Sequence, residues 1–127
     1  MTKTLIVTML AAVSMKAETL EAKVTFPFVV SGVPMPAGEY KILPVGLGRY
    51  TIGDRISGKK VILNGFGAAG NASRGPVAPH LGFVCTESRC VLSQVWFENT
   101  GVENRKVREQ MEAGSEPVQV AIVAMVR

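Results

Sequence analysis

Apolar and polar residues alternate most regularly near the start of the chain, in residues 19–30. Polar residues separate the apolar ones up to Thr25, and the apolar positions are Leu20, Ala22, Val24, Phe26 and Phe28. Because successive side chains of a strand point to opposite faces, this pattern predicts a strand with one buried and one wet face. Residues 31–38, with two prolines and two glycines, predict a turn, and residues 39–45 predict a second strand that pairs with the first as a hairpin.

Further strands are predicted by short apolar stretches that glycine, proline or polar clusters separate. They lie at residues 49–52, 60–63, 81–85, 90–97 and 118–126. The last stretch is apolar on both faces, which is typical of a central strand. The whole pattern predicts an all-β fold, an antiparallel sandwich or small barrel of about seven strands with one short helix.

The helix is predicted between the last two strands. Thr100 and Glu103 have the spacing of a capping box, in which each side chain bonds the backbone N–H of the other residue. Two pairs of opposite charges one turn apart follow, Arg105 with Glu109 and Arg108 with Glu112. Gly114 is expected to end the helix. Few of its positions are apolar, so we expect it on the surface.

The composition agrees with this fold class. The chain has 127 residues, of which 47% are hydrophobic and 19% charged, so one compact domain can form a core and a disordered chain is excluded. Its 13 glycines and 7 prolines interrupt too many runs for a helical bundle, and they suit short strands joined by turns.

The first 17 residues have the layout of a secretory signal peptide. Lys3 precedes an apolar run at residues 5–13, and small residues follow up to Ala17. The run is too short to span a bilayer, which needs about 20 residues. We predict cleavage after Ala17, with Ser14 as the competing position. Residues 18–127 would then be exported as a single β-domain, to the periplasm or out of the cell.

Loss of this segment changes the charge of the chain. The net charge is +4, and residues 1–17 contain two lysines and no acid, which leaves +2 on the mature chain. This near balance, without clusters of lysine and arginine, argues against nucleic-acid binding. Aromatic residues make up only 6% of the chain and form no girdles, so we do not expect an integral membrane protein.

Cys85 and Cys90 are the only cysteines, and they stand between two predicted strands. These strands would hold the thiols opposite each other at the mouth of a hairpin, and an exported chain meets an oxidising compartment. We therefore predict a disulfide, which would stabilise the fold by about 2 kcal/mol. His80 is the only histidine, so a structural zinc site lacks ligands, and the cysteine spacing differs from a CxxC redox motif.

Two glycine patterns resemble nucleotide-binding loops. Residues 53–60 nearly match GxxxxGK[ST], but Lys60 stands where the hydroxyl that holds magnesium is required. Residues 65–70 spell GxGxxG, but Gly75, Pro76 and Pro79 prevent the helix that would present its N–H groups to phosphate. We expect a hairpin turn and a flexible loop instead, and we predict no cofactor.

Candidate catalytic residues are few. His80 lies at a loop-to-strand junction, where we expect a partly exposed structural histidine, and no serine or cysteine near it forms a nucleophile motif. Asp54 is the only aspartate, so a paired-carboxylate hydrolase has no positive support. Tyr40, Tyr50 and Trp96 are expected in core or cross-strand packing, with a binding face as the alternative. We predict no catalytic, cofactor-binding or metal-binding residues.

Three stretches carry a resemblance to a known family. They are an F-x-F-x-V opening at residues 26–30, a PAGxY turn at residues 36–40 and an LSQVW strand at residues 92–96. With the charged Arg/Glu segment before the final strand, they resemble a family of small exported bacterial proteins that has no assigned biochemical function. The resemblance implies an export signal and an all-β domain, and it implies no catalytic or ligand residues.

These observations favour an exported protein that is not an enzyme. The first hypothesis is a binding or structural module of the periplasm or cell surface, whose exposed aromatic and strand-edge surface contacts an unknown protein or envelope partner. The alternative is a carrier whose barrel encloses a small apolar ligand, and a hydrolase is the remaining category. A filled interior would favour the module, and a ligand-sized apolar cavity would favour the carrier.

Overall fold

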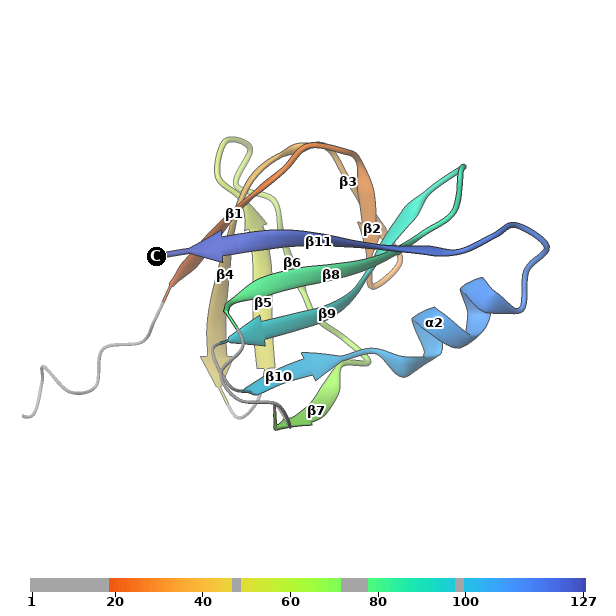
Figure 1. Ribbon diagram of the computed structural model, residues 1–127. Helices are drawn as coiled ribbons and strands as arrows, with labels where there is room; N and C mark the ends of the chain where they lie inside the picture. Colours follow the sequence, from red (N-terminus) through yellow and green to blue (C-terminus); the bar gives the residue numbers. More distant parts are fainter. Residues whose placement is uncertain (1–18, 47–48, 72–77, 98–99) are drawn as a thin grey trace, which may run out of the picture.

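The computed structural model describes residues 19–46, 49–71, 78–97 and 100–127, so the predicted signal peptide lies outside the described residues. Within this part of the chain, eleven strands form one curved sheet that nearly closes into a barrel (Figure 1). The helix α2 (Arg105–Glu112) lies at one end of it. The all-β prediction is confirmed. The strands outnumber the expected seven because several are only three to five residues long, too short for a readable alternation.

Neighbouring strands of the sheet come from distant parts of the chain. They are β1 (Leu20–Val24), β2 (Phe28–Val30), β3 (Val33–Met35), β4 (Gly38–Gly46), β5 (Arg49–Asp54), β6 (Lys60–Ile62), β7 (Gly67–Asn71), β8 (His80–Cys85), β9 (Cys90–Phe97), β10 (Thr100–Glu103) and β11 (Gln119–Val126). Their order is β3, β2, β9, β8, β11, β1, β4, β5, β6, with β10 on β9 and β7 on β10. β11 therefore joins the two halves, because it pairs with both β8 and β1.

The strand predicted at residues 19–30 is two strands in the structure. In β1, Leu20 and Val24 are buried, as the alternation predicts, and β1 pairs antiparallel with β4, with Leu20 opposite Ile42. Pro27, which has no N–H, then separates β1 from β2. The bend lets β2 leave β4 and pair with β3 and β9 instead.

The predicted capping box is wrong. Thr100 and Glu103 lie in β10, where the backbone pairs with β9 and β7 rather than starting a helix. Asn104 is the N-cap of α2, and its side-chain oxygen accepts a hydrogen bond from the N–H of Lys106 at 3.1 Å. Gly114 follows closely after the helix, as expected.

The charged side chains of α2 form one of the two predicted pairs. Arg108 contacts Glu112 at 3.2 Å, one turn further along the helix. Arg105 bonds Glu103 of β10 instead, also at 3.2 Å. The buried Met111 joins Val84 and Val91 of the sheet in a small apolar cluster. This cluster attaches α2 to the outer face of β8 and β9.

Side chains fill the interior of the barrel. The largest fully buried ones are Tyr40, Phe83, Leu20, Met35, Ile42, Ile52, Leu81, Leu92, Val24, Val30 and Val95. Phe28 packs edge-on against both Tyr40 and Phe83, with ring centroids 5.1 and 5.2 Å apart. Because these rings come from β2, β4 and β8, their packing holds the two halves of the sheet together.

β3 and β6, the two ends of the main strand order, approach each other through hydrogen bonds that involve residues beside them. The Ser31 hydroxyl donates to the carbonyl of Asn64 at 3.2 Å and accepts from the Asn64 N–H at 3.0 Å. The Lys59 ammonium donates to the carbonyl of Pro34 at 3.3 Å. Pro34 has no N–H to offer a neighbouring strand, which limits backbone pairing at this edge.

Candidate functional site

The first glycine pattern, at residues 53–60, forms the turn between β5 and β6, as expected. Asp54 Oδ1 accepts hydrogen bonds from the N–H groups of Ile56 at 2.9 Å and Ser57 at 3.4 Å. The bond from Ile56, assisted by those from Ser57, holds the pKa of Asp54 below its ordinary value. Gly58 has a positive φ of 78°. Asp54 is therefore a turn residue.

The second glycine pattern, at residues 65–70, is not the flexible loop that we expected. Gly65 has a positive φ of 81° and follows Asn64 in a turn. β7 then begins at Gly67 and pairs with β10, with Ala68 opposite Val102. Glycine and alanine leave no alternation to read in the sequence, but their backbones still pair with a neighbouring strand.

His80 and Trp96 pack across neighbouring strands. His80 is the first residue of β8, and its Nδ1 lies 2.8 Å from the carbonyl of Ala78. Its half-buried ring stacks on Trp96, with centroids 6.4 Å apart. The Trp96 ring covers Gly101, where a Cβ would lie 2.7 Å from Cδ2 of the indole. These contacts support the structural interpretation of both residues.

Both tyrosines also pack. Tyr40 is fully buried, and its hydroxyl donates to the carbonyl of Pro36, so the PAGxY turn closes on itself. A tyrosine that fixes a strand corner in this way is known in β-sandwiches. Burial raises the pKa of Tyr40 to about 12, and the Asp54 carboxylate adds to the shift. Tyr50 stacks on Phe97, with centroids 4.5 Å apart.

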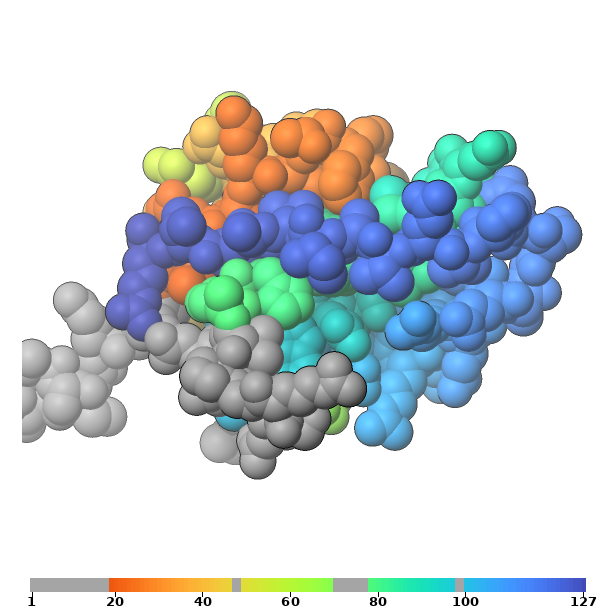
Figure 2. Space-filling view, in the orientation of Figure 1, coloured from red at the N-terminus to blue at the C-terminus, as the bar shows by residue number. Residues whose placement is uncertain are grey.

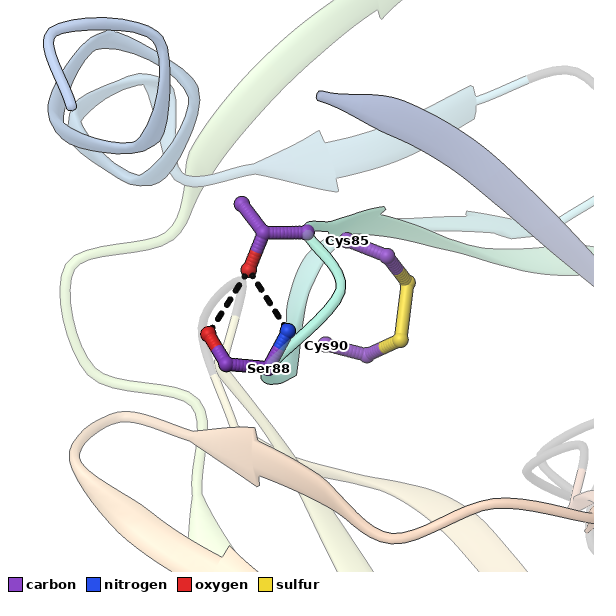
Figure 3. Close-up of a disulfide and its surroundings, with 4 residues drawn as sticks. Cys85, Ser88 and Cys90 are labelled. Carbon is purple, nitrogen blue, oxygen red and sulfur yellow. Dashed lines mark hydrogen bonds between the residues drawn. A yellow bond between two sulfur atoms is a disulfide. The ribbon is translucent and has the colours of Figure 1, made fainter. Parts of the chain in front are cut away.

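Cys85 and Cys90 form the predicted disulfide at the mouth of the β8–β9 hairpin (Figure 3). The two residues stand opposite each other in the register, with Cα atoms 4.0 Å apart. In the turn between them, the N–H of Thr86 donates to the carbonyl of Arg89 at 2.8 Å. The bridge packs against the barrel core and closes the hairpin at that end.

The tip of this hairpin contacts α2 and the segment after it. The Ser88 hydroxyl donates to Glu116 at 3.0 Å, and Arg89 Nη2 lies 3.7 Å from the sulfur of Met111. Hydrogen bonds from Thr86 and Ser88 lower the pKa of Glu116, and the charge of Arg89 adds to them. These contacts place the Arg89 side chain beside the helix.

A groove of about 810 Å³ runs between α2, the β2–β3 turn and the residues around the start of β7. We call it the helix groove. Its lining includes Val29, Gly32, Gly65, Arg89, Lys106 and Met111. Figure 1 shows that the β2–β3 turn, the segment before β7 and the beginning of α2 lie at the same end of the barrel. Turns and a helix end that are distant in sequence therefore form one surface.

The charges that line the helix groove are mainly positive. Arg89, Arg105 and Lys106 stand against one carboxylate, Glu103. A smaller groove of about 250 Å³, on another side of α2, has a different balance, with two arginines and three glutamates. Sequence reasoning missed the cationic groove because its residues are scattered along the chain. The sequence feature that could have indicated a cationic surface was the pair Arg105 and Lys106 at the start of the helix.

The outer face of β11 is a second exposed surface. Val120, Ile122 and Val126 are 54%, 59% and 65% exposed, and Figure 2 shows β11 at the surface along its length. The prediction that this strand is central is confirmed, because β11 pairs with both β8 and β1. The prediction that both of its faces are buried is wrong. α2 packs on β8 and β9 and leaves this side of β11 open.

Among the described residues, no three of the His, Cys, Asp and Glu side chains gather closely enough to hold a metal ion. No helix in this part of the chain has the length and apolar character required to cross a membrane. No family model, curated protein or solved structure matches the chain.

Proposed function

We propose that this protein is an exported, non-enzymatic binding module and that the helix groove is its contact surface. One observation carries the proposal. The barrel has a packed interior, and a wide, charged, concave surface lies on its outside. Concave surfaces with a few convergent polar groups are the usual location of binding sites. The disulfide hairpin and α2 also contact each other at the groove, where Arg89 Nη2 lies 3.7 Å from the sulfur of Met111.

The carrier alternative has less support. A carrier would keep an apolar space inside the barrel, but large side chains such as Tyr40, Phe83 and Met35 occupy the interior. Opening a ligand-sized space there would forfeit about 1.5 to 3 kcal/mol of apolar burial for each large side chain moved out of the core. Binding on the outside requires no such rearrangement.

Photo-crosslinking in the producing cells tests the proposal. A photoreactive amino acid is placed at Gln110, which lines the helix groove, and in a control chain at Lys41, an exposed residue outside this groove. We expect a discrete adduct at Gln110 and not at Lys41. Mass spectrometry of the chain from the envelope fraction is expected to show a new amino terminus. Equal adducts at both positions, or adducts at neither, would contradict the binding role of the groove. A chain that keeps Met1 and stays in the cytoplasm would contradict export.

A further inference from the structure

We infer that the helix groove binds an extended, acidic peptide segment of a partner protein. This inference rests on the proposed function and names the class of partner. It combines three features of the groove: the sign of its charge, the partly buried apolar residues on its floor, and the small residues that form one wall.

The charge of the groove favours an acidic partner. Arg105 is compensated by Glu103, which lies 3.2 Å away. Among the described residues, no carboxylate oxygen lies within 4.0 Å of the side-chain nitrogens of Arg89 or Lys106. The charge of Arg89 does contribute to the lowered pKa of Glu116. Both side chains are exposed. Carboxylates of a partner would therefore meet two cations whose charge the protein itself does not neutralise at close range.

Lys106 occupies a position that helix stability alone does not favour. It stands in the first turn of α2, which contains no acidic side chain. The helix dipole makes this end of a helix unfavourable for a cation, by about 0.3 to 1 kcal/mol at exposed sites. A carboxylate bound in the groove would offset this cost, and residues that break a local rule often mark functional positions.

The floor of the groove consists of apolar residues that are partly or almost fully buried. Val91 and Met111 are only 9% and 5% exposed, because they already pack against Val84 beneath the helix. An acyl chain gains affinity from the apolar area that it covers, at about 25 cal/mol per Å², and little of that area is available on these two residues. Val29 and Val107 are half-buried and add some apolar area to the lining, so the floor can contact apolar atoms of a peptide while the charges of Arg89 and Lys106 favour an acidic one.

One wall of the groove consists of small residues. Gly65, Gly67 and Ala68 line it, whereas Phe66 between the two glycines packs against the core, and Gly32 lies on the β2–β3 turn. A Cβ at Gly67 or Gly32 would meet no atom within 4 Å, so the space beside their backbones is open. An extended peptide can approach such backbones closely. The described lining residues include no aromatic ring on which a nucleobase could stack.

Fluorescence anisotropy tests the inference. The probe is a labelled peptide of about eight residues in which glutamate and serine alternate, and its control has glutamine in place of glutamate. The groove variant combines Arg89→Gln with Lys106→Gln. The matched variant combines Lys41→Gln with Lys60→Gln, which removes the same charge from a separate groove on the sheet. Circular dichroism establishes that both variants are folded.

We expect the glutamate peptide to bind at least tenfold more tightly than the glutamine peptide. The groove variant is expected to lose at least tenfold in affinity, whereas the matched variant changes less than twofold. Higher salt is expected to weaken binding. Equal losses in both variants, or equal binding of the two peptides, would overturn the inference. Binding of phosphatidylglycerol vesicles or single-stranded DNA through Arg89 and Lys106, without peptide binding, would overturn it as well.

The same data separate this inference from the proposed function. If Gln110 crosslinks to a partner in cells but the acidic peptide does not bind, the groove is a binding site and the acidic-peptide inference is refuted. If Gln110 forms no adduct, the proposed function itself is contradicted.

Discussion

Replacing Tyr40 with phenylalanine isolates the hydroxyl that closes the PAGxY turn. In the wild-type protein this hydroxyl donates to the carbonyl of Pro36, and the ring around it is fully buried. The substitution keeps the ring and removes one hydrogen bond, whose net contribution is about 1 kcal/mol. We expect the free energy of unfolding at about pH 7 to fall by this amount, as measured by urea denaturation. Tyr50→Phe, which removes a hydroxyl from the partly exposed ring stacked on Phe97, is the matched control.

The pH dependence gives a sharper test of the same contact. The pKa of Tyr40 is raised from its ordinary value of 10.0 to about 12 in the folded protein. Between these values the unfolded chain has lost the proton while the folded chain retains it. The unfolded state then binds fewer protons, so stability falls as pH rises through this window. At about pH 11 the loss attributable to Tyr40 is about 1.4 kcal/mol.

Tyr40→Phe removes this contribution, while lysines and other groups titrate in both chains. The difference in unfolding free energy between wild type and variant is therefore expected to shrink between about pH 7 and pH 11. Urea titrations at several pH values measure it. Parallel pH profiles for the two chains would refute the reasoning, because they would mean that the hydroxyl has the same pKa folded and unfolded.

Three further substitutions test the packing. Replacing Cys85 and Cys90 with serine is expected to lower stability by about 2 kcal/mol and leave the circular dichroism spectrum unchanged; two free thiols in the denatured, unreduced protein would refute the bridge. Gly101→Ala places a Cβ 2.7 Å from Trp96 Cδ2 and 2.8 Å from the Val95 carbonyl, so we expect a loss of about 1 to 3 kcal/mol by thermal denaturation. Gly67→Ala, with open space around it, is its control. Asn104→Ala is expected to lower the free energy of unfolding by about 1 kcal/mol, because it removes the N-cap of α2. An equal loss in Thr100→Ala would contradict this assignment and support Thr100 as the N-cap.

Local features of the sequence were sufficient for much of the fold. The alternation from Leu20 to Val24 predicts β1 and its buried face, since the pleat alone decides which side chains share a face. The four residues between Cys85 and Cys90 predict the disulfide, because a hairpin brings its two ends together. The turn at Asp54 was equally readable, since its contacts lie within four residues.

Pairing between distant segments changed the predictions that depended on it. Thr100 and Glu103 match a capping box, but β9 and β7 are available as neighbours on both sides, and backbone pairing takes these residues into β10. Val120 and Ile122 have the composition of a doubly buried strand, but α2 covers β8 and β9 rather than β11. Neither result follows from the residues themselves, because each depends on which element lies beside them.

The candidate site belongs to this second category. The sequence by itself determined the positions of the main strands, the disulfide hairpin and the turn residues, because each of these depends on contacts within a few residues. Only the tertiary structure brought Gly32, Gly65, Arg89 and Lys106 to one groove. These residues come from four separate segments, and the two glycines and two cations share one surface only after the sheet curves and α2 packs on its outer face. The spacing of these residues along the chain therefore does not predict the groove.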